Sequence, residues 1–200
     1  MKHSETWARC ASWAGVELDS SALSRLEVYE QWLATEAIDA GGLGPGERDR
    51  VHDRHIGDSL LFAGGLDNKP ESVLDVGSGV GLPGIPLAIA MASIPFTLLD
   101  RSVRRTDMLR RITRILDLEN VTVEQGEIKG APRQEAAIVS RATFPPDQAR
   151  QVFLPLLRPE GVAVLGGSWT RPPTDPGWTV IEIPPTVLDH RIWLLMMRQT

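Results

Sequence analysis

Four glycines and two acids in the middle of the chain have the types and the spacing of a ligand-binding loop. Residues 73–84 read VLDVGSGVGLPG, in which Asp75 lies in an apolar run and is followed by Gly77, Gly79, Gly81 and Gly84. Glycines let a backbone approach a ligand closely, and the N-terminus of a following helix presents free N–H groups. Asp100 comes about 20 residues after the loop, where a carboxylate could accept hydrogen bonds from sugar hydroxyls.

Two kinds of cofactor use such a loop. Gly79, Gly81 and Gly84 match the G-x-G-x-x-G pattern that binds dinucleotides. In that pattern the glycines begin directly after the strand, whereas here Gly77 and Ser78 come first. A carboxylate near the loop also suits a cationic ligand better than a pyrophosphate. A tight turn without a ligand is the structural alternative.

The elements around the loop alternate between short apolar runs and helical patterns. Strands are predicted over residues 73–76, 96–100, 121–125, 136–140 and 161–167, and helices over 83–92, 106–118 and 146–157. This alternation predicts an α/β fold with a doubly wound, mostly parallel sheet, whose ligands bind beyond the carboxyl ends of the strands. Runs at 178–183 and 191–197 have no helix between them and predict a C-terminal antiparallel hairpin.

The part before residue 67 is predicted to be a helical layer. Ser21 is expected to cap a helix over residues 23–38, which the glycines of residues 41–46 end. We therefore expect residues 1–66 to be an N-terminal helical extension and residues 67–200 to be the core.

The composition indicates a globular protein. Hydrophobic residues make up 42% of the chain and six residues are tryptophan, which excludes disordered and fibrous classes. No stretch approaches the roughly 18 apolar residues of a membrane span, and the N-terminus does not resemble a signal peptide, so a cytoplasmic protein without membrane contact is expected. Cys10 is the only cysteine and the four histidines are scattered, so neither a disulfide nor a metal site is expected.

Basic residues are concentrated in one segment of an acidic chain. The net charge is -5, yet residues 101–114 contain six arginines against the single acid Asp107. Such a segment can bind phosphates locally, because charges more than about 10 Å away are screened by salt. Arginine also makes up 18 of the 21 basic residues, so a general compositional bias explains the pattern equally well.

The arrangement of Asp75 and the glycines as D-x-G-x-G-x-G resembles motif I of class I S-adenosylmethionine-dependent methyltransferases. A wider and ordered match resembles the RsmG (GidB) family, which methylates guanine N7 in small-subunit (16S) ribosomal RNA. The matching segments are RHIGDSL (54–60), LDVGSGVGLPGIPLAIA (74–90), FTLLDRSVRR (96–105), LENVTV (118–123), SRA (140–142) and LDHRIWLLMM (188–197).

The resemblance implies a Rossmann-like methyltransferase core, S-adenosylmethionine as cofactor and ribosomal RNA as partner, in a monomer without a metal. The positions it assigns to the cofactor are Gly77, Ser78, Gly79, Gly81, Leu82, Asp100, Ile128, Lys129 and Arg141. Those it assigns to RNA are Arg54, Arg104 and Arg105. Arg141, His55 and Asp58 are expected to shape the site without exchanging protons, because guanine N7 has a free lone pair.

The chain departs from the family pattern at three places. EIKG (127–130) stands where the family usually has R-A-E-E, Gly166 replaces a lysine, and the family's N-terminal asparagine signatures are missing. These departures leave open a methyltransferase for a small metabolite or a noncatalytic module that binds the cofactor or RNA, and the G-x-G-x-x-G match leaves open a nicotinamide dehydrogenase. Trp169 could stack on a base, although packing is the commoner use of tryptophan.

Overall fold

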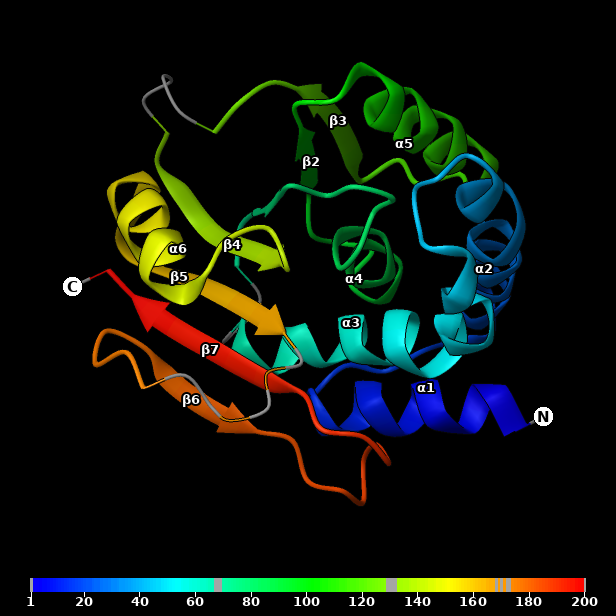
Figure 1. Cartoon of the computed structure of the whole chain (residues 1–200), viewed down its shortest axis with the longest axis horizontal. Helices are drawn as coiled ribbons and strands as arrows, with labels where there is room; N and C mark the ends of the chain where they lie inside the picture. Colours follow the sequence, from blue (N-terminus) through cyan, green and yellow to red (C-terminus); the bar gives the residue numbers. More distant parts are fainter. Residues whose placement is uncertain are drawn as a thin grey trace.

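A seven-stranded sheet forms the centre of the computed structural model, which describes residues 2–66, 70–128, 133–167, 169, 171 and 174–199. The strand order is β3-β2-β1-β4-β5-β7-β6 (Figure 1). The strands are β1 (Val73–Val76), β2 (Phe96–Asp100), β3 (Val121–Gln125), β4 (Glu135–Arg141), β5 (Leu157–Gly167), β6 (Thr179–Glu182) and β7 (Trp193–Arg198). The first five are parallel, whereas β7 pairs antiparallel with both β5 and β6. The predicted doubly wound sheet with an antiparallel end is confirmed.

The helices precede the sheet and alternate with its strands. They are α1 (Lys2–Trp13), α2 (Ser20–Trp32), η1 (Leu33–Ala37), η2 (Pro45–Arg50), η3 (Val51–Gly57), α3 (Asp58–Leu61), η4 (Phe62–Gly65), α4 (Gly84–Ala90), α5 (Val103–Ile115), α6 (Pro146–Phe153) and η5 (Leu154–Leu156). None of these described helices is long and apolar enough to cross a membrane.

The alternation of side chains along β1 divides the core into two parts. Val73 packs with the larger hydrophobic cluster, which includes residues of α1 to α5, whereas Leu74 and Val76 pack with the smaller cluster around α6. Figure 1 shows α1 to α5 grouped together and α6 apart from them. One face of the sheet thus carries most of the described helices, including the whole N-terminal layer.

The N-terminal layer is built around buried apolar side chains. Trp7 and Cys10 of α1 are fully buried, with the three-residue spacing of one helix face, and so are Leu26 and Tyr29 of α2. Helix α1 was not predicted from the sequence, but the helix predicted over residues 23–38 is present as α2 continued by η1.

The start of α2 differs from the prediction in its cap. The N-cap is Asp19 and not Ser21, which already lies inside the helix. A carboxylate oxygen of Asp19 accepts a hydrogen bond of 2.7 Å from the backbone N–H of Ala22. The carboxylate is also the better partner for the positive end of the helix dipole. The division into an extension and a core after residue 66 stays a prediction.

Candidate functional site

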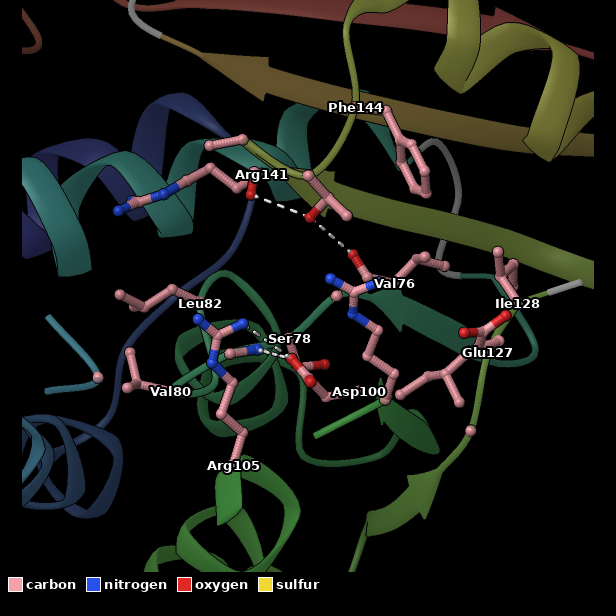
Figure 2. A pocket seen from close by; sticks show the side chains of 18 of the residues that line it. Val76, Ser78, Val80, Leu82, Asp100, Arg105, Glu127, Ile128, Arg141 and Phe144 are labelled. Atoms are coloured by element: carbon pink, nitrogen blue, oxygen red, sulfur yellow. Dashed lines mark hydrogen bonds and ion pairs between the residues drawn. The ribbon is translucent and has the colours of Figure 1, made fainter. Parts of the chain in front are cut away.

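A cavity of about 680 Å³ lies beyond the carboxyl ends of β1, β2, β3 and β4 (Figure 2). Sheet order reverses here, because β1 pairs with β2 on one side and with β4 on the other. Its walls comprise Val76–Val80 and Leu82 after β1, Leu99–Arg101 and Arg105 at β2 and α5, Gly126–Ile128 after β3, Arg141–Phe144 after β4, and Gly42 and Leu43 from the N-terminal layer. The volume is within the range of about 300 to 1,000 Å³ typical of small-molecule sites.

Asp100 joins the end of β2 to the glycine loop. Its Oδ2 accepts a hydrogen bond of 2.9 Å from the backbone N–H of Gly79, and its Oδ1 accepts one of 2.9 Å from Ser102. The residue is only 2% exposed. A carboxylate has about four acceptor positions, so each oxygen can still accept a hydroxyl from a ligand. The structure thus places Asp100 at the cavity wall beside the glycine loop, and its role as the ribose acid stays a prediction.

Gly77 and Gly79 of the loop are required for different steric reasons. Gly79 has a φ of 60°, and the nearest atom to the position of an added Cβ is 3.9 Å away, so a side chain there would extend into open space at the cavity. Gly77 has a φ of 72°, and the Thr143 side chain lies 2.5 Å from its Cβ position. Gly79 therefore leaves room for a ligand, whereas Gly77 lets the segment after β4 approach the loop.

Gly81 and Asp75 contribute to the packing beneath the loop. Gly81 does not line the cavity, and the space of its missing Cβ is filled by Ile85. Asp75 is fully buried, and its Oδ2 accepts a hydrogen bond of 3.0 Å from the backbone N–H of Gly84 at the start of α4. The Asp75 carboxylate, which the sequence suggested as better suited to a nearby cationic ligand than to a pyrophosphate, points to the start of α4 and does not line the cavity.

Burial determines the protonation of Asp75. Desolvation raises the pKa of its carboxyl group from 3.8 to about 7, against the opposing effect of the Gly84 hydrogen bond. Within the described part of the chain, the buried Oδ1 atom has no hydrogen-bond partner. The carboxyl group consequently gains a proton far more easily than an exposed aspartate.

Arg141 lines the cavity at the end of β4 and connects it to the N-terminal layer. Its side chain runs away from Asp100 in Figure 2. The guanidinium group donates to the backbone carbonyls of Arg54 and His55, at 3.0 and 3.3 Å, and to Nδ1 of His55. Arg141 therefore anchors η3 against the end of β4.

His55 is a neutral partner in this contact. Burial and the nearby Arg141 cation lower the pKa of its imidazole to about 4. Its Nδ1 therefore accepts from Arg141, while Nε2 lies 3.0 Å from Oε2 of Glu47 and donates to it. His55 and Asp58 do not line the cavity, and His55 is connected to its wall through Arg141.

The arginines predicted for RNA do not share one location. Arg105 lies in the cavity wall, with Nη1 3.7 Å from Oδ2 of Asp100. Arg104 is exposed and donates to the backbone carbonyl of Ala40 outside the cavity. Arg54 is not a lining residue either, and its backbone carbonyl accepts from Arg141. The expected basic pair is thus divided between the cofactor-sized cavity and the outer surface.

Packing explains two of the unusual C-terminal residues. The Cβ position of Gly166 is occupied by the Phe62 ring, so a lysine there would displace it. The ring of Trp169 lies 2.8 Å from the Cβ position of Gly167 and does not line the cavity. Ile128 does line the cavity, whereas Lys129 lies outside the described residues.

Several lining residues were not predicted from the sequence. Phe144 and Thr143 follow Arg141 in the chain, and the hydroxyl of Thr143 donates to the Val76 carbonyl at 3.2 Å. Gly42 and Leu43 belong to the glycine segment that was interpreted only as a helix end. The residue types alone do not identify these positions, because predicting them requires knowing which loops meet at the strand ends. In the part of the chain that the structure describes, no group of three or more histidine, cysteine or acidic side chains could hold a metal ion.

Comparison with known proteins finds relatives named ribosomal RNA small subunit methyltransferase G. A protein of Mycobacterium marinum, "Ribosomal RNA small subunit methyltransferase G", is 39% identical over 145 residues, covering 68% of this chain and 63% of that protein. A protein of the same name from Mycobacterium ulcerans is 36% identical over 156 residues, covering 74% of this chain and 91% of that protein. The match to the first relative therefore spans less than two thirds of its length.

A solved structure supports the fold, and a family model gives the family. A SAM-dependent methyltransferase from Aquifex aeolicus superposes with a TM-score of 0.55 and 16% identity, covering 72% of this chain and 90% of that one. This likeness confirms the expected methyltransferase-like fold. The model of the family described as rRNA small subunit methyltransferase G matches residues 22–170. With most of its length matched, the chain belongs to the GidB family of small-subunit rRNA methyltransferases.

Proposed function

We propose that this chain transfers a methyl group from S-adenosylmethionine to guanine N7 in small-subunit ribosomal RNA. The observation that carries the proposal is the buried Asp100 carboxylate, hydrogen-bonded to the glycine loop at the wall of a cofactor-sized cavity. Membership of the family and the names of the relatives support the reaction and the substrate.

The residues at the cavity fit this cofactor. Asp100 retains acceptor positions for two ribose hydroxyls, and the open space beside Gly79 leaves room for the ligand against the loop backbone. Ile128, which is 9% exposed, offers an apolar contact for an adenine ring after β3. The remaining wall, Arg141–Phe144 after β4, is then left for the acceptor.

The chemistry places few demands on acid–base groups. When bound, S-adenosylmethionine supplies an electrophilic methyl group on a sulfonium, and guanine N7 has a lone pair and no proton to lose. The protein must align the two and exclude water, and such alignment alone can be worth about 7 to 11 kcal/mol. Neutral His55, whose pKa is about 4, and Arg141 are suited to hold the wall and not to remove a proton.

The proposal is tested by following labelled methyl groups into three pools. The protein is incubated with labelled S-adenosylmethionine and with small ribosomal subunits, naked ribosomal RNA or an extract of small molecules. Label in either RNA pool supports the proposal. Cofactor binding with label only in the small-molecule extract would instead identify a metabolite methyltransferase.

A further inference from the structure

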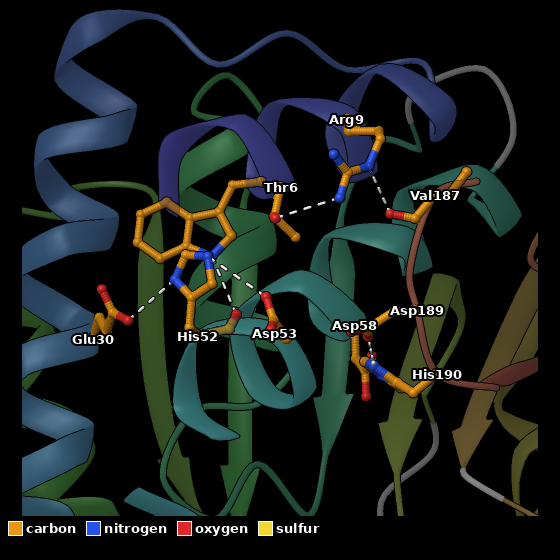
Figure 3. Close-up of polar contacts among 10 residues, drawn as sticks. Thr6, Arg9, Glu30, His52, Asp53, Asp58, Val187, Asp189 and His190 are labelled. Atoms are coloured by element: carbon orange, nitrogen blue, oxygen red, sulfur yellow. Dashed lines mark hydrogen bonds and ion pairs between the residues drawn. The ribbon is translucent and has the colours of Figure 1, made fainter. Parts of the chain in front are cut away.

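A part-buried histidine–aspartate contact links the loop between β6 and β7 to the segment that holds Arg141. Nε2 of His190 lies 2.7 Å from Oδ1 of Asp58, the first residue of α3, although the two are 132 positions apart (Figure 3). Asp58 is 7% exposed. It lies three and four residues after His55 and Arg54, whose backbone carbonyls accept hydrogen bonds from Arg141.

Asp58 is also the main negative charge acting on Arg141. Burial lowers the pKa of the Arg141 guanidinium, and the Asp58 carboxylate makes the largest contribution opposing this effect. A buried cation needs such a countercharge, because an unbalanced charge in the interior is strongly destabilising. The carboxylate of Asp58 therefore favours the charged Arg141 that donates to His55.

The orientation of Arg141 affects the cavity wall. The next residue, Ala142, has a φ of 56°, which is a strained conformation for a residue with a side chain. The turn is held by Thr143, whose hydroxyl lies 3.2 Å from the Val76 carbonyl and 3.3 Å from the Arg141 carbonyl. Release of Arg141 from η3 would loosen this wall without touching the Asp100 side of the cavity.

We propose that His190 is a positioning residue: by holding the Asp58 carboxylate in place, it keeps Arg141 bound to His55 and the acceptor wall of the cavity in its productive shape. The inference deepens the proposed function and rests on it for its activity measurement. It assigns the β6–β7 loop, which lies outside the cavity, a role in methyl transfer.

The proposal implies a pH dependence. The hydrogen bond with Asp58 raises the pKa of the His190 imidazole, while burial raises that of the Asp58 carboxyl group. The pair is complete only while His190 is protonated, so transfer should decline as the pH rises through the pKa of His190 in the folded protein. The other groups that act on the pair or its loop are Asp189 beside it, Arg54 of η3, Arg141 of β4, the un-ionised Cys10 thiol of α1 with a pKa of about 12, and Arg9 of α1, which donates to the Val187 carbonyl.

The first test compares three variants of the full chain. His190→Ala removes the contact, His190→Gln keeps a donor without a titrating charge, and His52→Ala is the matched control. His52 lies 3.1 Å from Glu30, and its side chain is 13% exposed against 15% for His190. Figure 3 shows the two pairs in the same region.

The expected result is a loss confined to turnover. With saturating cofactor and RNA, His190→Ala should lower kcat by about 2- to 30-fold, the range for residues in a coupled network, with KM for the cofactor unchanged. His190→Gln should recover part of this loss and lack the decline at alkaline pH. Equal kcat per folded molecule for His190→Ala, His52→Ala and the parent protein would overturn the proposal, since it would leave His190 a purely structural role.

The second test needs no acceptor and so stands apart from the proposed function. In protein labelled with ¹⁵N-arginine, the side-chain resonance of Arg141 should shift as His190 titrates and should lose this shift in His190→Gln. If the chemical shift of the Arg141 side chain does not change as His190 titrates, the inference is overturned even if the parent protein methylates RNA. Absence of RNA methylation together with a coupled resonance would instead count against the proposed function alone.

Discussion

The backbone N–H of Gly79 donates a 2.9 Å hydrogen bond to Oδ2 of Asp100, which ties the loop after β1 to the end of β2. The bond fixes the carboxylate at the cavity wall and orients the glycine backbone toward the same space. Both halves of the proposed cofactor site thus depend on one contact between neighbouring strand ends.

Replacing Asp100 with alanine should weaken binding of S-adenosylmethionine or its demethylated product by about 1.5 to 3 kcal/mol, the range for hydrogen bonds to a charged group. Calorimetry measures the change directly, and Asp100→Asn, which keeps an acceptor oxygen, should lose less. An unchanged Kd in Asp100→Ala would mean that the ribose does not bind at this carboxylate.

Replacing Gly79 with valine should abolish cofactor binding while the protein stays folded. A side chain at a φ of 60° costs about 1 to 2 kcal/mol in strain, and the valine would extend into the open space where the ligand is expected. Gly79→Ala is the control, because it introduces the strain with less bulk. The melting temperature should fall by a similar amount in both variants. Intact cofactor binding in Gly79→Val would show that the ligand does not occupy the space beside this residue.

Asp75→Asn should remove a pH-dependent cost to stability. The folded state raises the pKa of this carboxyl group from 3.8 to about 7, so the folded protein binds the proton more tightly than the unfolded chain does. The Asp75 carboxyl group therefore contributes fully to the free energy of unfolding below about pH 4. This contribution, at most about 4 kcal/mol, is lost as the pH rises through about 7.

An asparagine oxygen can still accept from Gly84 and carries no charge. Urea unfolding at both ends of this pH range should therefore show Asp75→Asn gaining stability relative to the parent protein as the pH rises. A constant difference between the two proteins would contradict the raised pKa.

Arg104→Ala should weaken binding to ribosomal RNA mainly at low salt. If Arg104 contacts one phosphate, the slope of log affinity against log salt should flatten by about one unit. Arg110→Ala is the matched control from the same helix, because Arg110 is paired with Asp107 at 3.0 Å. Identical slopes for the parent protein and Arg104→Ala would show that the RNA contacts another surface.

Much of this architecture could be predicted from local patterns. β2 and β3 begin and end at the predicted residues, since each is an apolar run between clear breaks. Their parallel arrangement placed Asp100 and the glycine loop at the same edge of the sheet.

The rest depends on information that local patterns lack. Arg104 and Arg105 are neighbours on one helix, and only the packing of α5 shows which of them turns into the cavity. The sequence shows only that Asp75 lies just before the loop, whereas the pleat of β1 directs its side chain toward α4. The pairing of His190 with Asp58 joins segments 132 positions apart, which no local spacing reveals.

The most direct test of the account is the identity of the methylated atom. Small ribosomal subunits are incubated with the protein and labelled S-adenosylmethionine, and the digested RNA is analysed by mass spectrometry beside the same reaction with Asp100→Ala. The account predicts labelled 7-methylguanosine in small-subunit RNA, formed more slowly by the variant at limiting cofactor. A protein that binds the cofactor but leaves no label on guanine N7 in any form of this RNA would contradict it.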